Sequence, residues 1–256
     1  MDDDTLLGVL HDAATAVRRA LDGLDDWGEV RTRKGQYHSD LVADDAALEV
    51  IDAAGLGWMS EETGAAHVDR DLLVVLDPVD GSTNAGRGIP WFATSLCVLD
   101  ADGMRAALVV DQARNRRYAA TRGGGAFVDG DAIGPTSCDS MRTAIVGLSG
   151  HPPHYLGWRQ YRALGAAALD LCAVAEGVLD AYLDCSPNAH GSWDYLGGLL
   201  ICREAGAHVA EAFDRPLIER DHAARRTPIA AATPALLDEA VAARRSIGWP
   251  DDPPLE

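Results

Sequence analysis

The most constraining feature of the sequence is an apolar run that ends in two closely spaced aspartates. Residues 71–76 (Asp-Leu-Leu-Val-Val-Leu) have the length and aliphatic composition of a largely buried strand. The segment Asp77–Ser82 (Asp-Pro-Val-Asp-Gly-Ser) follows directly. Two carboxylates three residues apart at a strand end can point at one spot if the chain turns between them. The pattern therefore predicts an acidic site at the edge of a buried sheet.

The residues between and after these aspartates suit such a site. Pro78 restricts the turn and removes a backbone donor, and Gly81 lets backbone amides approach a ligand closely. Ser-Thr-Asn at 82–84 is typical of a helix start, where free amides can bind phosphate. Taken alone, the motif is equally consistent with an ordinary turn, since Asp, Pro and Gly are common in turns.

Hydrophobic periodicity indicates a mixed α/β chain in two halves. Helices are predicted at 5–24, 40–54, 161–177, 193–205 and 234–245. Strands are predicted at 57–60, 71–76, 92–99, 105–111, 115–120, 124–128, 143–148, 178–183, 207–213 and 227–231. Strand runs and helix pairs alternate in blocks, so we divide the chain into an N-terminal α+β half, 1–138, and a C-terminal α/β half, 139–256, within one compact unit.

Composition excludes several classes of protein. The 256 residues are 47% hydrophobic, enough for a packed core, and the net charge is -18, which repels nucleic acids and anionic membranes. The five cysteines are scattered without a CxxC pair, so neither a zinc site nor a disulfide framework is predicted. The acidic N-terminus is unlike a signal peptide, and no apolar run is long enough to cross a membrane, so we expect a cytoplasmic protein.

Two further acidic segments follow predicted elements. Glu61 and Glu62 come directly after the strand 57–60, and Trp193-Asp194 begins the helix 193–205. Adjacent acids after a strand are usually a solvated loop, and a lone Asp at a helix start is usually an N-cap. Each segment is therefore uninformative by itself.

Together the three acidic segments resemble the inositol monophosphatase family, which also includes fructose-1,6-bisphosphatase and adenosine bisphosphate phosphatase relatives. The resemblance rests on Glu61-Glu62, Asp77–Ser82 and Trp193-Asp194 with Gly197-Gly198, in that order, and on Ile89–Ser95. It extends over essentially the whole chain. It implies a layered αβαβα sandwich, a homodimer, and a lithium-sensitive phosphatase that uses two or three Mg²⁺ ions.

The resemblance also implies roles for single residues. Glu61, Asp77 and the carbonyl of Val79 would hold one Mg²⁺, and Asp77, Asp80 and Asp194 a second. Glu61 and Ser82 would orient and help to deprotonate the attacking water, with Asp44, or its neighbour Asp45, as the upstream acid near that water. Substrate would meet the amides of Gly81 and Ser82, the backbone of Gly165, Ala166 and Ala167, and the Asp184 carboxylate, which is expected to bind hydroxyls.

Substrate choice stays open at this point. The loop Cys185–His190 is longer than in the simplest relatives, which indicates either a substrate other than inositol phosphate or a tolerated surface insertion. Lys34, the only lysine, lies where relatives often carry a basic residue.

We expect a Mg²⁺-dependent phosphomonoesterase acting on a small phosphorylated metabolite, with inositol monophosphate or a similar sugar or polyol phosphate first. The alternatives are a fructose-1,6-bisphosphatase, a nucleotide 3′-phosphatase, a histidinol-phosphate phosphatase, or a phosphatase for a pathway-specific sugar or nucleoside phosphate. A catalytically silent regulator that binds a phosphometabolite or a partner protein is the non-enzyme alternative.

Overall fold

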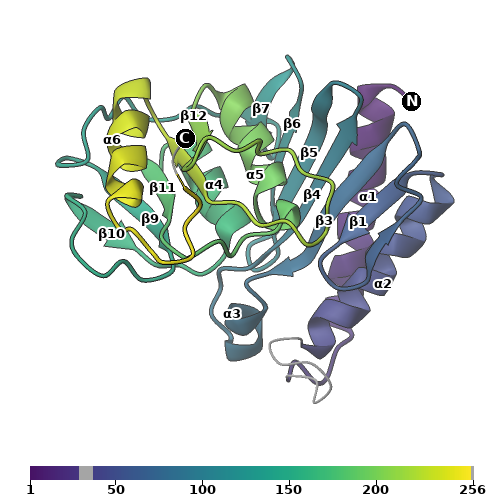
Figure 1. Cartoon of the computed structure of the whole chain (residues 1–256). Helices are drawn as coiled ribbons and strands as arrows, with labels where there is room; N and C mark the ends of the chain where they lie inside the picture. The colour runs from purple at the N-terminus through teal and green to yellow at the C-terminus, as the bar shows by residue number, and fades with distance from the viewer. Residues whose placement is uncertain (29–36, 255–256) are drawn as a thin grey trace.

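Two β-sheets and three layers of helices alternate through the protein in the computed structural model, which describes residues 1–28 and 37–254 (Figure 1). Helices α1 (Asp3–Asp22) and α2 (His38–Ala53) cover one face of the first sheet. Helices α4 (Ala167–Ala175) and α5 (Ser192–Ala205) lie between the sheets, and α6 (Pro234–Arg245) covers the outer face of the second. The predicted αβαβα sandwich is confirmed.

The first sheet has eight strands in the order β2-β1-β3-β4-β5-β6-β7-β8. Their bounds are β1 Gly57–Ser60, β2 Gly64–Ala66, β3 Leu73–Asp80, β4 Ala93–Asp100, β5 Gly103–Asp111, β6 Arg116–Thr121, β7 Gly125–Val128 and β8 Asp131–Ala132. The second sheet has the order β10-β9-β11-β13-β12, with β9 Ile145–Ser149, β10 Gln160–Arg162, β11 Ala181–Asp184, β12 His208–Glu211 and β13 Pro228–Ala231. Both α4 and α5, from the later part of the chain, pack toward the first sheet, so the two sheets share one core.

Strand β3 is buried on both faces, as its continuous aliphatic run predicts. Val74 and Leu76 pack toward α1 and α2, whereas Leu73 and Val75 pack toward α4 and α5. This alternation fixes the register of the strand, since a slip of one residue would exchange the two faces. The acidic end of β3 is therefore held at a defined edge of the sheet.

The prediction of one continuous helix over 161–177 is wrong. Residues 160–162 form the edge strand β10, parallel to β9, and the helix begins only at Ala167. Gly165 has φ of +86°, a left-handed backbone that interrupts any helix and that non-glycine residues rarely adopt. The short strands β2 and β8 were also not predicted, because two- and three-residue strands carry too little alternation to be recognised.

Other boundaries agree with the sequence. Helix α6 has the predicted bounds, and α5 ends at Gly206, whose φ of +92° makes the expected left-handed cap. Among the described residues, no helix combines the length and apolarity that crossing a membrane requires.

Candidate metal centre

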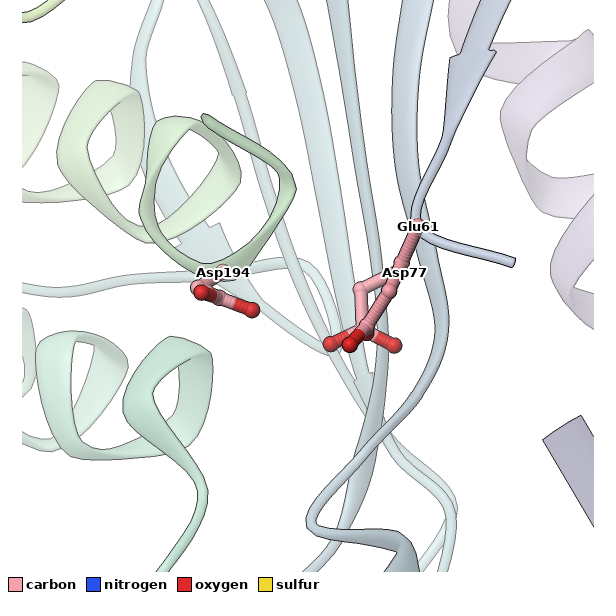
Figure 2. A group of neighbouring side chains, drawn as sticks. All are labelled: Glu61, Asp77 and Asp194. Carbon is pink, nitrogen blue, oxygen red and sulfur yellow. The ribbon is translucent and has the colours of Figure 1, made fainter. Parts of the chain in front are cut away.

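Three carboxylates from distant parts of the chain converge at one edge of the first sheet (Figure 2). Glu61 follows β1, Asp77 lies in β3, and Asp194 lies in the first turn of α5. One ligand atom from each lies within 4.8 Å of the others. Three oxygen donors at this spacing can share a single cation.

Strand register brings the first two carboxylates together. Strand β1 runs parallel to β3 with Ser60 opposite Leu76, so Glu61 and Asp77 leave the sheet at the same level. The Glu61 N–H donates to the Leu76 carbonyl at 3.3 Å, which continues the pairing by one residue. Parallel strands end at the same edge, and this places the two side chains next to each other.

Asp194 reaches the cluster from the opposite side, across the gap between β3 and α5 (Figure 2). Its Oδ2 accepts hydrogen bonds from the Gly191 N–H at 2.8 Å and from His190 Nδ1 at 3.0 Å. Asp194 thus satisfies the free amide at the helix start with its own carboxylate, and the same bonds fix the side-chain direction.

The cluster is electrostatically unfavourable without a counter-charge. Burial and the neighbouring carboxylates of Asp194, Glu62 and Asp80 raise the pKa of Glu61 to about 8. Burial, then Glu61 and Asp80, raise the pKa of Asp77 well above its ordinary value. The positive charge of a divalent cation would offset this repulsion. Hard cations such as Mg²⁺ and Ca²⁺ also prefer oxygen ligands. The donor set therefore fits a divalent metal.

Asp80 lies on the far side of a register shift in β3 from Asp77. Its two carboxylate oxygens accept the Ala167 N–H at 3.2 Å and the Ala168 N–H at 2.7 Å, at the start of α4. Burial and the charge of Asp194 raise its pKa to about 7. Val79 is buried within the shift and donates its N–H to Asp77 Oδ1 at 2.9 Å. The turn predicted between the aspartates is thus a bulge that holds Asp77 and anchors α4 to β3.

Asp40, which the sequence did not single out, faces the cluster from α2. Its charge contributes to the raised pKa values of Glu61 and Asp77, and the neighbouring Ser82 side chain acts to lower the pKa of Asp40 itself. Burial is the largest of the causes that raise its own pKa to about 7. Its Oδ2 also accepts the Tyr37 N–H at 2.9 Å at the helix start. An acid three residues after a helix cap was the signal available in the sequence.

Asp44, expected as the upstream acid, lies one turn further along α2. Its carboxylate accepts hydrogen bonds from the hydroxyls of Ser60 and Thr63, which fasten α2 to the end of β1. Asp45, the alternative, is exposed. Asp44 is therefore engaged in holding α2 to the end of β1, whereas the charge of Asp40 acts on Glu61 and Asp77.

The glycine after Asp80 is required by its surroundings. Gly81 has φ of +85°, and an added Cβ would lie 3.1 Å from the Gly165 carbonyl, the Ala166 Cβ and the Trp91 carbonyl. It is the N-cap of the short helix α3 (Ser82–Arg87). The structure thus brings the predicted substrate contacts at Gly81 and at Gly165–Ala167 together.

Asp184 is completely buried at the end of β11. Its Oδ1 accepts the Ser186 N–H at 2.8 Å, and among the described atoms its Oδ2 has no hydrogen-bond partner. Solvent does not reach this carboxylate in the structure. Lys34 lies outside the described residues.

A loop from the second sheet crosses to the first. We call residues 212–227, between β12 and β13, the crossing loop; Figure 1 shows it in front of β3 and β4. Within it, His222 Nε2 lies 2.9 Å from the Ser60 carbonyl, and its ring contacts Trp193 at a centroid distance of 4.5 Å. The Glu219 carbonyl accepts the Ser192 hydroxyl at 2.8 Å. The loop therefore connects the residue before Glu61 with the residues before Asp194.

A five-layer α/β sandwich with a convergent carboxylate cluster is the architecture of a class of metal-dependent enzymes. Comparison with known proteins identifies the family within that class. The model of the inositol monophosphatase family matches residues 34–248. This chain belongs to that family, whose members are phosphoric monoester hydrolases.

Several of its relatives are named for phosphatase activities on inositol monophosphate or fructose-1,6-bisphosphate. The chain is 31% identical to a fructose-1,6-bisphosphatase/inositol-1-monophosphatase of Archaeoglobus fulgidus, covering 82% of this chain and 86% of the relative. It is also 31% identical to an inositol-1-monophosphatase of Mesorhizobium japonicum, covering 82% and 87%. A Pyrococcus horikoshii protein with similarities to inositol-1 monophosphatase has the same fold, with a TM-score of 0.81 at 24% identity over 94% and 96% of the two chains.

Proposed function

We propose that this protein is a Mg²⁺-dependent phosphomonoesterase that hydrolyses a small phosphorylated metabolite, with inositol monophosphate or a similar sugar or polyol phosphate as the first substrate to test. The convergence of Glu61, Asp77 and Asp194 within 4.8 Å carries the proposal. Family membership supports the phosphatase chemistry. A bisphosphate such as fructose-1,6-bisphosphate is the second candidate, since the Archaeoglobus relative is named for both activities.

The proposed metal ligands are Glu61, Asp77, the Val79 carbonyl, Asp80 and Asp194. When bound, Mg²⁺ neutralises phosphate charge and lowers the pKa of a nearby water. Asp80 can take part although it caps α4, since a carboxylate has about four acceptor positions and two are used. The resemblance to the family implies two or three ions, and Asp77 belongs to both of the predicted ligand sets.

The proton-handling residues are Glu61, Ser82 and Asp40. Ser82 lies close enough to Asp40 to act on its pKa, so the hydroxyl can orient a water while the carboxylate accepts a proton. We assign this role to Asp40 in preference to Asp44, which is engaged by Ser60 and Thr63. Gly81, Ser82 and Gly165–Ala167 would line the phosphate and substrate side of the site, because close backbone approach is already required there.

We further propose a homodimer and inhibition by lithium from family membership, and a cytoplasmic location. We also propose that residues 1–138 carry most of the metal ligands and that 139–256 complete the site through Asp194. Light scattering on purified protein tests the dimer, and a monomer at all concentrations would contradict it.

Phosphate release from a substrate panel is the decisive experiment. The panel holds inositol-1-phosphate, fructose-1,6-bisphosphate, adenosine 3′,5′-bisphosphate, histidinol phosphate, and several sugar and nucleoside monophosphates, each with Mg²⁺ and with chelator. We expect Mg²⁺-dependent turnover that Asp77→Asn abolishes and that Asp238→Asn, an exposed site on α6, leaves unchanged.

The ranking of substrates then identifies the specificity. Turnover that persists in Asp77→Asn or in chelator would contradict the proposed metal centre. Mg²⁺ binding by calorimetry without turnover on any substrate would instead favour the silent phosphometabolite-binding protein.

A further inference from the structure

The carboxylate of Asp194 is held from behind by a histidine that the proposed chemistry does not use. His190 Nδ1 lies 3.0 Å from Asp194 Oδ2, and its side chain is 13% exposed. Because a carboxylate only accepts, the ring nitrogen must carry the proton in this contact. The Gly191 N–H occupies the same Oδ2. Oδ1 of Asp194 is the oxygen left for the cluster.

The other ring nitrogen is fixed as firmly. His190 Nε2 lies 3.1 Å from the Ser149 hydroxyl, 3.2 Å from the Tyr182 hydroxyl and 3.6 Å from Asp184 Oδ1. Tyr182 and Asp184 are completely buried in β11. The imidazole is therefore clamped between the second sheet and the first turn of α5.

The loop that carries His190 is itself anchored to the core. The fully buried Arg244 donates from Nε to the Asp184 carbonyl at 2.7 Å and from an Nη to the Ser186 carbonyl at 3.0 Å. It also pairs with Asp252 at 2.6 Å. These contacts hold the beginning of the loop Cys185–His190 against α6.

We propose that His190 is a positioning residue for the metal centre: it aims Asp194 at Glu61 and Asp77, and the buried Asp184 serves to orient His190 instead of contacting substrate. This inference rests on the metal centre of the proposed function. The loop Cys185–His190 would then have a defined role. It adds a second support to Asp194, the proposed ligand that lies on a helix.

The contacts of both ring nitrogens are consistent with this role, since they leave the imidazole one orientation against Asp194. Residues that hold a metal ligand from outside the coordination sphere typically change metal affinity or activity by about 10- to 100-fold when they are replaced.

Two amide substitutions distinguish the contact of Nδ1 with Asp194 from the contacts of Nε2 with Ser149 and Tyr182. The amide nitrogen of Asn occupies roughly the place of Nδ1, and that of Gln the place of Nε2. His190→Asn can therefore keep the bond to Asp194, whereas His190→Gln keeps only the bonds to Ser149 and Tyr182. We expect the Mg²⁺ dissociation constant, measured by calorimetry, to rise about 10- to 100-fold in His190→Gln and much less in His190→Asn.

Metal-free melting temperature and a control variant distinguish positioning from simple packing. His151→Gln, on an exposed loop after β9, should change neither affinity nor melting temperature. Equal loss of Mg²⁺ affinity in the two His190 variants, or no loss in either, overturns the positioning role while leaving the phosphatase intact. Absence of Mg²⁺ binding by the unmodified protein overturns the metal centre, and the role of His190 with it.

Discussion

The carboxylates at the edge of the first sheet and the carboxylate on α5 reach the same point by different means. Glu61 and Asp77 are placed by backbone pairing of two parallel strands, with the Glu61 N–H continuing the ladder. Asp194 is placed by the Gly191 N–H at its own helix start, by the His190 side chain, and by the crossing loop packed against Trp193. The first region is held by main-chain hydrogen bonds within the sheet. The second depends on residues from the crossing loop and the second sheet.

This difference predicts different responses to mutation. In the strand region the backbone is held by strand pairing, and only the ligand side chains are free to vary. Substitutions of these ligands should therefore reduce turnover and leave the fold intact. Around α5 the ligand direction is set by neighbours, so substitutions of non-ligands should weaken metal binding. The following predictions test this contrast, from the largest expected effect to the smallest.

Asp77→Asn should have the largest effect. It removes the charge at the centre of both proposed ligand sets, and we expect loss of turnover on the order of a thousandfold, about 4 kcal/mol of transition-state stabilisation. The metal-free melting temperature should rise, because a buried repulsive carboxylate is gone. Phosphate-release kinetics and calorimetric melting measure both quantities; a lower melting temperature would show that Asp77 is structural.

Asp40 and Asp44, one helical turn apart, should separate chemistry from stability. Asp40→Asn should lower kcat by about 100-fold or more, the usual contribution of a positioned acid or base. Asp44→Ala should leave the Ser60 and Thr63 hydroxyls without their acceptor and cost about 1–3 kcal/mol of unfolding free energy. Steady-state kinetics and denaturant unfolding on both variants check this, and the reverse pattern would return the role to Asp44.

The metal-free protein should lose stability as pH rises. The carboxyl pKa is raised in the folded state to about 7 for Asp40 and Asp80 and about 8 for Glu61, from ordinary values of 3.8 and 4.5. Between these limits the folded state binds more protons than the unfolded chain, so unfolding free energy falls with increasing pH.

Bound Mg²⁺ replaces those protons, so its stabilising effect should be larger at about pH 8.5 than at about pH 5.5. Thermal melting in chelator and in Mg²⁺ at the two pH values measures it. Stability in chelator that is independent of pH would contradict the repulsion described for the cluster.

His222→Ala should have the smallest effect. The substitution removes one hydrogen bond to the Ser60 carbonyl and the ring contact with Trp193, worth about 1 kcal/mol of unfolding free energy. We expect a small fall in melting temperature and less than a tenfold fall in kcat/KM. A loss as large as that of Asp77→Asn would mean that the crossing loop holds the strand region too, and that the contrast between the two regions is wrong.

The sequence alone determined the elements and the acids that lie on them. Continuous aliphatic residues define β3, Gly206 ends α5, and the resemblance to the family selected Glu61, Asp77, Asp80 and Asp194 with the layered fold. Each of these follows from local composition or a short motif, where the physical cause lies within a few residues of the effect.

Only the tertiary structure decided which neighbours act on the site. Asp40 acts on Glu61 and Asp77 because α2 packs on the first sheet, and Asp184 is buried beside His190. The strand β10 exists because β9 offers it an edge, although its own sequence continues the pattern of the next helix. Pairing and burial between residues far apart in the chain are set by packing, and a single sequence carries no local signal for them.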